Sequence, residues 1–101
     1  MDRDAFTAEL AAQAFDEPVT VEREAGGSMD VHVHPFEAKA LVLRGELSIR
    51  TDDGERTYRA GEVFHLAAGV PHAERFGLDG VSYLVGRKAS AGSAAPPQGA
   101  A

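Results

Sequence analysis

The 101-residue sequence contains no cysteine, and this absence excludes three kinds of chemistry together. Without thiols the chain cannot form disulfides, bind a metal through sulfur or use a cysteine nucleophile. Any metal site would therefore have to use histidine and carboxylate ligands.

Long apolar runs and clusters of basic residues are also missing. No run approaches the roughly 20 apolar residues that a bilayer helix needs, and Met1 to Asp4 do not begin a basic-then-apolar secretory signal. Lysine and arginine are scattered, with a net charge of -6 and a pI near 5.1. Nucleic-acid binding needs a clustered basic surface. We therefore expect a cytoplasmic protein with no membrane or nucleic-acid partner.

What is present fits one small globular domain. Hydrophobic residues make up 44% and charged residues 26%, which is ordinary for a soluble folded protein. Apolar residues spaced by three and four predict a short amphipathic helix from Asp4 to Phe15, with Asp2 or Asp4 as the N-cap. Pro18 should end it.

After this helix, the sequence predicts an all-β sandwich or barrel, because short apolar-polar runs alternate with turns. Asp52-Asp53-Gly54 is a strong hairpin signal. The expected strands cover residues 19–24, 29–34, 39–44, 46–51, 57–60, 62–67, 72–76 and 81–85. Glycines at 45, 61, 69, 77 and 80 should mark corners.

The predicted organisation has three parts. Residues 1–17 form a helical segment that packs on the barrel, residues 18–88 form the barrel, and residues 89–101 form a disordered tail without large apolar side chains. Residues 41–43 are apolar on both strand faces, so the helix, the second sheet or another subunit should cover them. We favour a homodimer.

His32 and His34 form a His-x-His pair in a segment with strand character. Side chains at i and i+2 of a strand share one face, which places the two backbones about 6.6 Å apart. Two ring nitrogens can then converge on one ion at about 2.0–2.1 Å. Pro35 favours an extended His34. Alone, the pair is equally compatible with two surface or core histidines.

A longer pattern surrounds this pair. Residues 26–45 run from glycine through five residues to His-x-His, then to Glu37 and a second glycine. After fifteen more residues, residues 61–72 run from glycine through Ala67-x-Gly to His72. The two segments resemble the first and second motifs of small single-domain cupins, in order and at compatible spacing. Ala67 replaces the usual proline, and Phe76 replaces the usual asparagine.

The resemblance implies the cupin double-stranded β-helix, a jelly-roll barrel, here with a short N-terminal helix. In that family two histidines and a glutamate of the first motif, with the histidine of the second, hold a divalent metal ion inside the barrel. His32, His34 and His72 match these positions, and zinc, iron, manganese or nickel would be the ion. The acid does not match cleanly: the usual spacing places it at Ala38 or one residue later, whereas here it is Glu37.

A shift of one residue on a strand reverses the face. Either Pro35 and Phe36 reset the phase, so that the Glu37 carboxylate completes a mixed nitrogen and oxygen site, or Glu37 faces solvent beside Lys39. The fourth histidine, His65, should point outward by alternation. The candidate metal ligands are therefore His32, His34, Glu37 and His72.

Two functions fit this reading. The first is a metal-binding domain, with oxygenase- or isomerase-type activity on a small molecule as one possibility. The alternative is a non-catalytic module that binds or senses a sugar or another metabolite without a tightly bound metal. The family hosts enzymes, sugar-binding modules and storage proteins, so the fold leaves enzyme status open.

Overall fold

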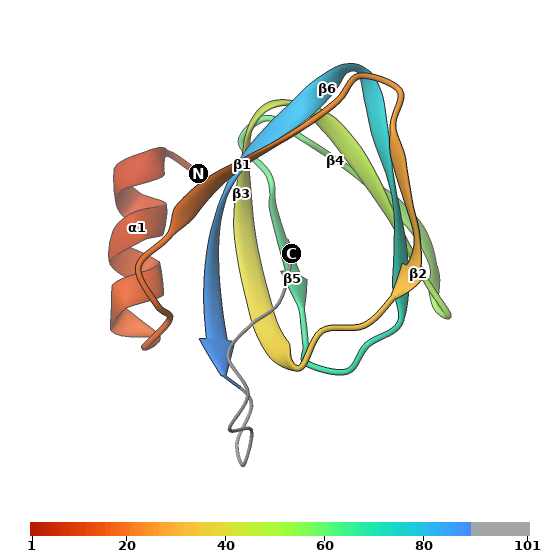
Figure 1. Cartoon of the computed structure of the whole chain (residues 1–101). Helices are drawn as coiled ribbons and strands as arrows, with labels where there is room; N and C mark the ends of the chain where they lie inside the picture. Colours follow the sequence, from red (N-terminus) through yellow and green to blue (C-terminus); the bar gives the residue numbers. More distant parts are fainter. Residues whose placement is uncertain (90–101) are drawn as a thin grey trace.

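Two long antiparallel strands, β3 (Phe36–Thr51) and β6 (His72–Ala89), pair along most of their length and organise the fold (Figure 1). The structure is a computed structural model that describes residues 1–89. Of the disordered tail predicted for residues 89–101, only Ala89 lies within the described residues, and it is the last residue of β6. The remaining elements are α1 (Arg3–Ala12), β1 (Val19–Arg23), β2 (Ser28–His32), β4 (Gly54–Arg59) and β5 (Val63–Leu66).

Both long strands belong to both walls of a barrel. On one wall, β1 pairs with residues 81–85 of β6, and β5 pairs with residues 38–41 of β3. On the other wall, β2 pairs with the start of β6, and β4 pairs with residues 46–51 of β3. Every pairing is antiparallel, and the order is β1-β6-β3-β4 with β2 and β5 added beside β6 and β3. The predicted all-β jelly-roll barrel with a short N-terminal helix is confirmed.

Glycines allow the backbones of β3 and β6 to approach each other closely where both strands bend from one wall of the barrel to the other. Gly45 and Gly80 have φ angles of 74° and 73°, which disfavour residues with a side chain. A Cβ on Gly45 would lie 2.0 Å from the Gly80 carbonyl oxygen. The sequence predicted turns at these corners, but each strand continues through its bend. The expected strands 39–44 and 46–51 are therefore one strand, and so are 72–76 and 81–85.

Strand alternation fills the barrel with apolar side chains. Along β3, Phe36, Ala38 and Ala40 are buried, whereas Glu37 and Lys39 lie on the opposite face. The buried core contains Phe36, Ala38, Ala40, Val42, Leu47, Ile49, Phe64, Leu66, Val81, Tyr83 and Val85. Within residues 1–89, no helix is long and apolar enough to cross a bilayer.

The helix α1 packs on the outside of one wall (Figure 1). Phe6 and Leu10 are buried against Leu41 and Leu84. This packing covers the outer face of β3, which explains why residues 41–43 are apolar on both strand faces. The sequence left open whether the helix, the second sheet or another subunit covers this strand, and in the structure the N-terminal helix covers it.

The ends of α1 follow known capping patterns. The Asp2 carboxylate accepts a hydrogen bond of 2.8 Å from the Ala5 amide, which confirms one of the two expected N-caps. The helix ends at Ala12, earlier than the predicted Phe15. Ala14 has a φ of 62°, and the Phe15 amide donates to the Leu10 carbonyl at 3.0 Å. This Schellman ending, rather than Pro18, stops the helix.

Candidate metal centre

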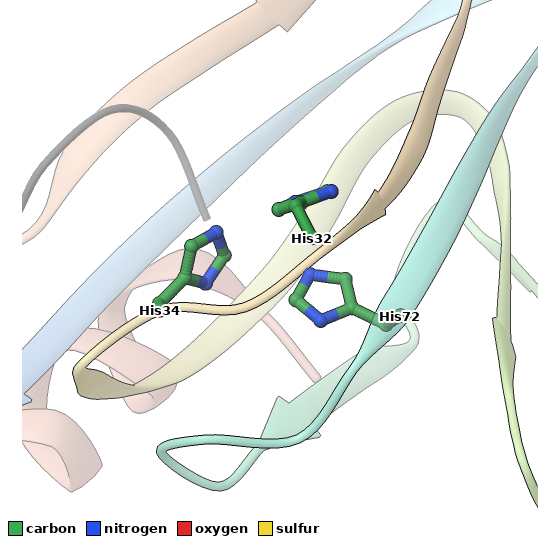
Figure 2. Close-up of side chains that lie close together, drawn as sticks. All are labelled: His32, His34 and His72. Atoms are coloured by element: carbon green, nitrogen blue, oxygen red, sulfur yellow. The ribbon is translucent and has the colours of Figure 1, made fainter.

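The three histidines predicted to share a site lie together at one end of the barrel interior (Figure 2). His32 ends β2, His34 lies on the link from β2 to β3, and His72 begins β6. Their ring centroids are 4.3 Å apart for His32 and His72, 4.9 Å for His34 and His72, and 5.0 Å for His32 and His34. Their ligand nitrogens all lie within 4.8 Å of one another.

Local backbone structure explains this convergence. Val31 and Val33 are 61% and 57% exposed, so the alternation of β2 continues past the end of the strand and turns both histidines inward. His32 pairs with His72 in the register between β2 and β6. The Gly69 amide donates to the His34 carbonyl at 2.9 Å, which ties the loop before His72 to the His-x-His segment.

Two backbone carbonyls fix the tautomer of two of the rings. Nδ1 of His32 donates to the Asp30 carbonyl at 2.7 Å, and Nδ1 of His72 donates to the Val70 carbonyl at 2.9 Å. A neutral imidazole with its proton on Nδ1 presents a free lone pair at Nε2, which is how metal-binding histidines are commonly oriented. Nε2 of His32, of His34 and of His72 is buried and has no hydrogen-bond partner.

The rings differ in their electrostatic setting. Burial, with the charges of His72 and His32, lowers the pKa of His34 to about 4. Its ring stacks on Phe36 at a centroid distance of 4.7 Å. Burial also disfavours the charged form of His72, but the nearby Glu74 carboxylate and the Val70 carbonyl outweigh it and raise the pKa. His34 is therefore an unprotonated ligand candidate over most of the pH range.

Glu74 is an acidic neighbour of the cluster that the sequence analysis missed. One carboxylate oxygen lies 3.4 Å from Nε2 of His32 and 3.5 Å from Nε2 of His72. Its side chain is 1% exposed, and neither oxygen has a hydrogen-bond partner. The signal was available, because a residue two positions after an inward histidine on a strand also points inward.

The structure does not bring Glu37 to the histidines. Phe36 points into the core, so the next residue lies on the outer face of β3, where the Glu37 carboxylate pairs with His65. Pro35 and Phe36 therefore do not shift the strand phase. The His65 side chain is 50% exposed, in agreement with the outward orientation expected for it.

Further polar groups are buried inside the barrel without hydrogen-bond partners. They are the Tyr83 hydroxyl and the Nε atoms of Arg23 and Arg87. Burial, with the charge of Glu74, raises the pKa of Tyr83 to about 12, so its hydroxyl keeps its proton at neutral pH. The Arg87 guanidinium lies 5.7 Å from the centre of the Phe36 ring. These donors could hold the polar end of a small ligand.

Two surface cavities lie near the site without being lined by the three histidines. One, of about 790 Å³, borders residues 28–31, Arg50, Glu55 and residues 73–75, and so reaches Glu74. The other, of about 680 Å³, lies at the β3–β4 hairpin and residues 65–71. The candidate site is therefore identified by the three converging histidines and not by either cavity.

Comparison with known proteins identifies the family. The cupin domain model matches residues 19–80, which contain both histidine motifs and most of the barrel. The chain belongs to the cupin family. A search of curated proteins gives no match.

Solved structures of other cupins support the same fold. An RmlC-like cupin from Shewanella frigidimarina is 22% identical, with a TM-score of 0.61, over 72% of this chain and 66% of that one. The DMSP lyase DddQ from Ruegeria pomeroyi is 26% identical, with a TM-score of 0.66, over 80% and 41%. An oxalate decarboxylase from Bacillus subtilis is 16% identical, with a TM-score of 0.65, over 86% and 25%. This cupin thus spans less than two thirds of each of these proteins.

The residues present in this cupin fit a metal ion. Its donor set is three imidazoles and a nearby carboxylate, a combination that suits divalent transition metals. Buried polar atoms are normally paired, and at the histidine cluster the three Nε2 nitrogens and the two Glu74 oxygens are without partners. A cation held by the three histidines would use their nitrogen lone pairs, and it would lie near the Glu74 oxygen that is 3.4 Å and 3.5 Å from Nε2 of His32 and His72.

Proposed function

We propose that this cupin binds one divalent transition metal ion through Nε2 of His32, His34 and His72. The observation that carries the proposal is the convergence of three histidines, each with one ring nitrogen within 4.8 Å of the others and each with a buried, unpartnered Nε2 atom. Two of these Nε2 atoms belong to rings whose Nδ1 protons are already committed to backbone carbonyls. Protein atoms alone leave these lone pairs unused, whereas an ion would use all of them.

Zinc, iron, manganese and nickel are the candidate ions, because imidazole and carboxylate ligands suit them. When bound with open coordination positions, such an ion can act as a Lewis acid or bind dioxygen. We propose an oxygenase- or isomerase-type reaction on a small molecule. Two of the similar structures carry enzyme names, a DMSP lyase and an oxalate decarboxylase, and this supports a catalytic role.

Elemental analysis of the full chain, purified without chelator and then incubated with each candidate ion, tests metal binding. We expect one ion per chain in the wild type and in His65→Ala, the matched control outside the site. His72→Ala should lose the ion. Wild-type protein that stays free of metal after incubation, or equal loss in both variants, would exclude the proposed site.

A non-catalytic module that binds a small polar ligand without metal is the second candidate. The specific observation in its favour is that Glu74 lies close to two histidines and the pKa of His72 is raised. A protonated His72 could then be balanced by Glu74, leaving other donors to a ligand. Calorimetric titration of metal-free protein with sugars and small metabolites distinguishes the two, because only this function requires binding without an ion.

The homodimer stays a prediction. Its motive was the apolar strand at residues 41–43, and α1 packs on that strand within the same chain. Light scattering coupled to size exclusion measures the oligomeric state directly.

A further inference from the structure

We infer that Glu74, rather than Glu37, supplies the carboxylate ligand of the metal site. The inference rests on the proposed metal binding and names one more ligand of that site. It places the acid on β6, beside the second histidine motif, instead of on the strand that follows the His-x-His pair.

The burial of Glu74 is the first argument. Its side chain is 1% exposed, and both carboxylate oxygens lack a hydrogen-bond partner. Within residues 1–89, no lysine or arginine nitrogen lies within 4.0 Å of the carboxylate; only His32 and His72 do. A buried carboxylate is costly unless it is paired, hydrogen-bonded or bound to a metal. Neutral histidine rings that present lone pairs do not provide that pairing, whereas a protonated His72 or a shared cation would.

The spacing of the donor atoms is the second argument. Two ligands held at 2.0–2.1 Å from a tetrahedral ion are about 3.3–3.4 Å apart. The Glu74 oxygen lies 3.4 Å from Nε2 of His32 and 3.5 Å from Nε2 of His72. These distances are too long for good hydrogen bonds, yet they match the edges that a metal coordination polyhedron would have between Glu74 and these two histidines. Glu74 is outside the group of ligand atoms that all lie within 4.8 Å of one another, so its carboxylate would have to approach His34 to bind the same ion.

Strand geometry is the third argument. Glu74 follows His72 by two residues on β6, so both side chains point into the barrel. Glu37 lies on the outer face of β3 and already pairs with His65. The neighbouring inward position is Ala38, which is fully buried in the apolar core and offers no ligand. Within residues 1–89, Glu74 is therefore the acidic residue that the barrel places beside the histidines.

The test measures the zinc and cobalt affinities of the full chain by competition with a chromophoric chelator. The variants are Glu74→Gln, which keeps the size but removes the charge, Glu74→Asp, and the matched control Glu37→Gln. Loss of a second-shell partner typically weakens metal binding about 10–100-fold, so Glu74→Gln should weaken it by at least that much. Glu74→Asp should fall between wild type and Glu74→Gln, and Glu37→Gln should bind as wild type does.

A second readout separates ligation from a merely structural role. At saturating cobalt, Glu74→Gln should change the visible absorption spectrum, because one oxygen donor is replaced, while Glu37→Gln leaves it unaltered. Circular dichroism checks that each variant is folded, and if Glu74→Gln fails to fold, the affinity and spectrum of Glu74→Asp decide the question.

Wild-type affinity and an unchanged cobalt spectrum in Glu74→Gln would overturn the inference while leaving metal binding by the histidines intact. Equal weakening in Glu37→Gln would overturn it as well. Wild-type protein that binds neither ion would remove this inference and the proposed function together.

Discussion

The low pKa of His34 should make the metal-free protein sensitive to mild acid. His34 is 7% exposed, and burial with the charges of His72 and His32 lowers its pKa from 6.5 to about 4. Between these values the unfolded chain binds a proton that the folded protein does not. The contribution of His34 to stability is therefore fully present above pH 6.5 and is lost as the pH falls towards 4.

The size of this effect follows from the two pKa values. Compared with neutral pH, the lowered pKa of His34 should reduce the free energy of unfolding by about 2 kcal/mol at pH 5 and by about 3 kcal/mol at pH 4. His72 acts in the opposite sense, because its pKa is raised. Its contribution is fully present below pH 6.5 and is lost as the pH rises through its folded pKa, so the two windows hardly overlap.

Urea unfolding of chelator-treated protein at pH 7, 5 and 4 measures this effect. His34→Gln removes the titrating ring, and every other group contributes to the pH dependence of both proteins. We therefore expect the loss of stability from pH 7 to pH 5 to be smaller in the variant by about 2 kcal/mol. Identical pH dependence in the two proteins would refute the assignment of a buried, neutral ring to His34.

Three predictions concern the scaffold, each read from chemical or thermal unfolding. Gly45→Ala places a Cβ 2.0 Å from a carbonyl oxygen at a residue with positive φ, so it should lower the free energy of unfolding by about 3 kcal/mol or more. In Gly54→Ala the Cβ would have no atom within 4 Å, so the variant should lose only about 1–2 kcal/mol from the strain of a positive φ. Ala14→Gly should stabilise the protein by about 1 kcal/mol, since glycine relieves the positive φ at the helix end, and a loss would contradict this. Leu10→Ala should cost about 2–5 kcal/mol because it empties the contact of α1 with the barrel, while Leu78→Ala, 94% exposed, should change stability by less than about 0.5 kcal/mol.

The all-β class was predictable because its signals are local, whereas the jelly-roll topology was implied by the resemblance to cupins. The Asp52-Asp53-Gly54 turn joins β3 and β4 as expected, with Thr51 paired to Gly54. Strand parity predicted that His32 and His34 would share one face, and the exposure of Val31 and Val33 shows that this face is the inner one. These features depend on neighbouring residues, which periodicity and turn chemistry describe well.

The positions of strand ends were less predictable because they depend on distant contacts. Gly45 reads as a turn residue in the sequence, yet it lets β3 pass close to Gly80 without a break. The end of α1 likewise depends on Ala14 adopting a conformation that alanine disfavours. Packing of Phe15 beside the cluster formed by α1 and the barrel accompanies this strained turn.

The choice between Glu37 and Glu74 shows why motif spacing and strand parity can select different residues as the carboxylate ligand. A motif counts residues along one segment, and that count selects Glu37 because it is the acid that follows the His-x-His pair. A barrel interior collects inward side chains from several strands, so a carboxylate from β6 can occupy the same space as one from β3. The parity rule that paired His32 with His34 also pairs His72 with Glu74. Applied to every strand that carries a histidine, that rule selects the inward acid, and the metal affinities of Glu74→Gln and Glu37→Gln decide between the two rules.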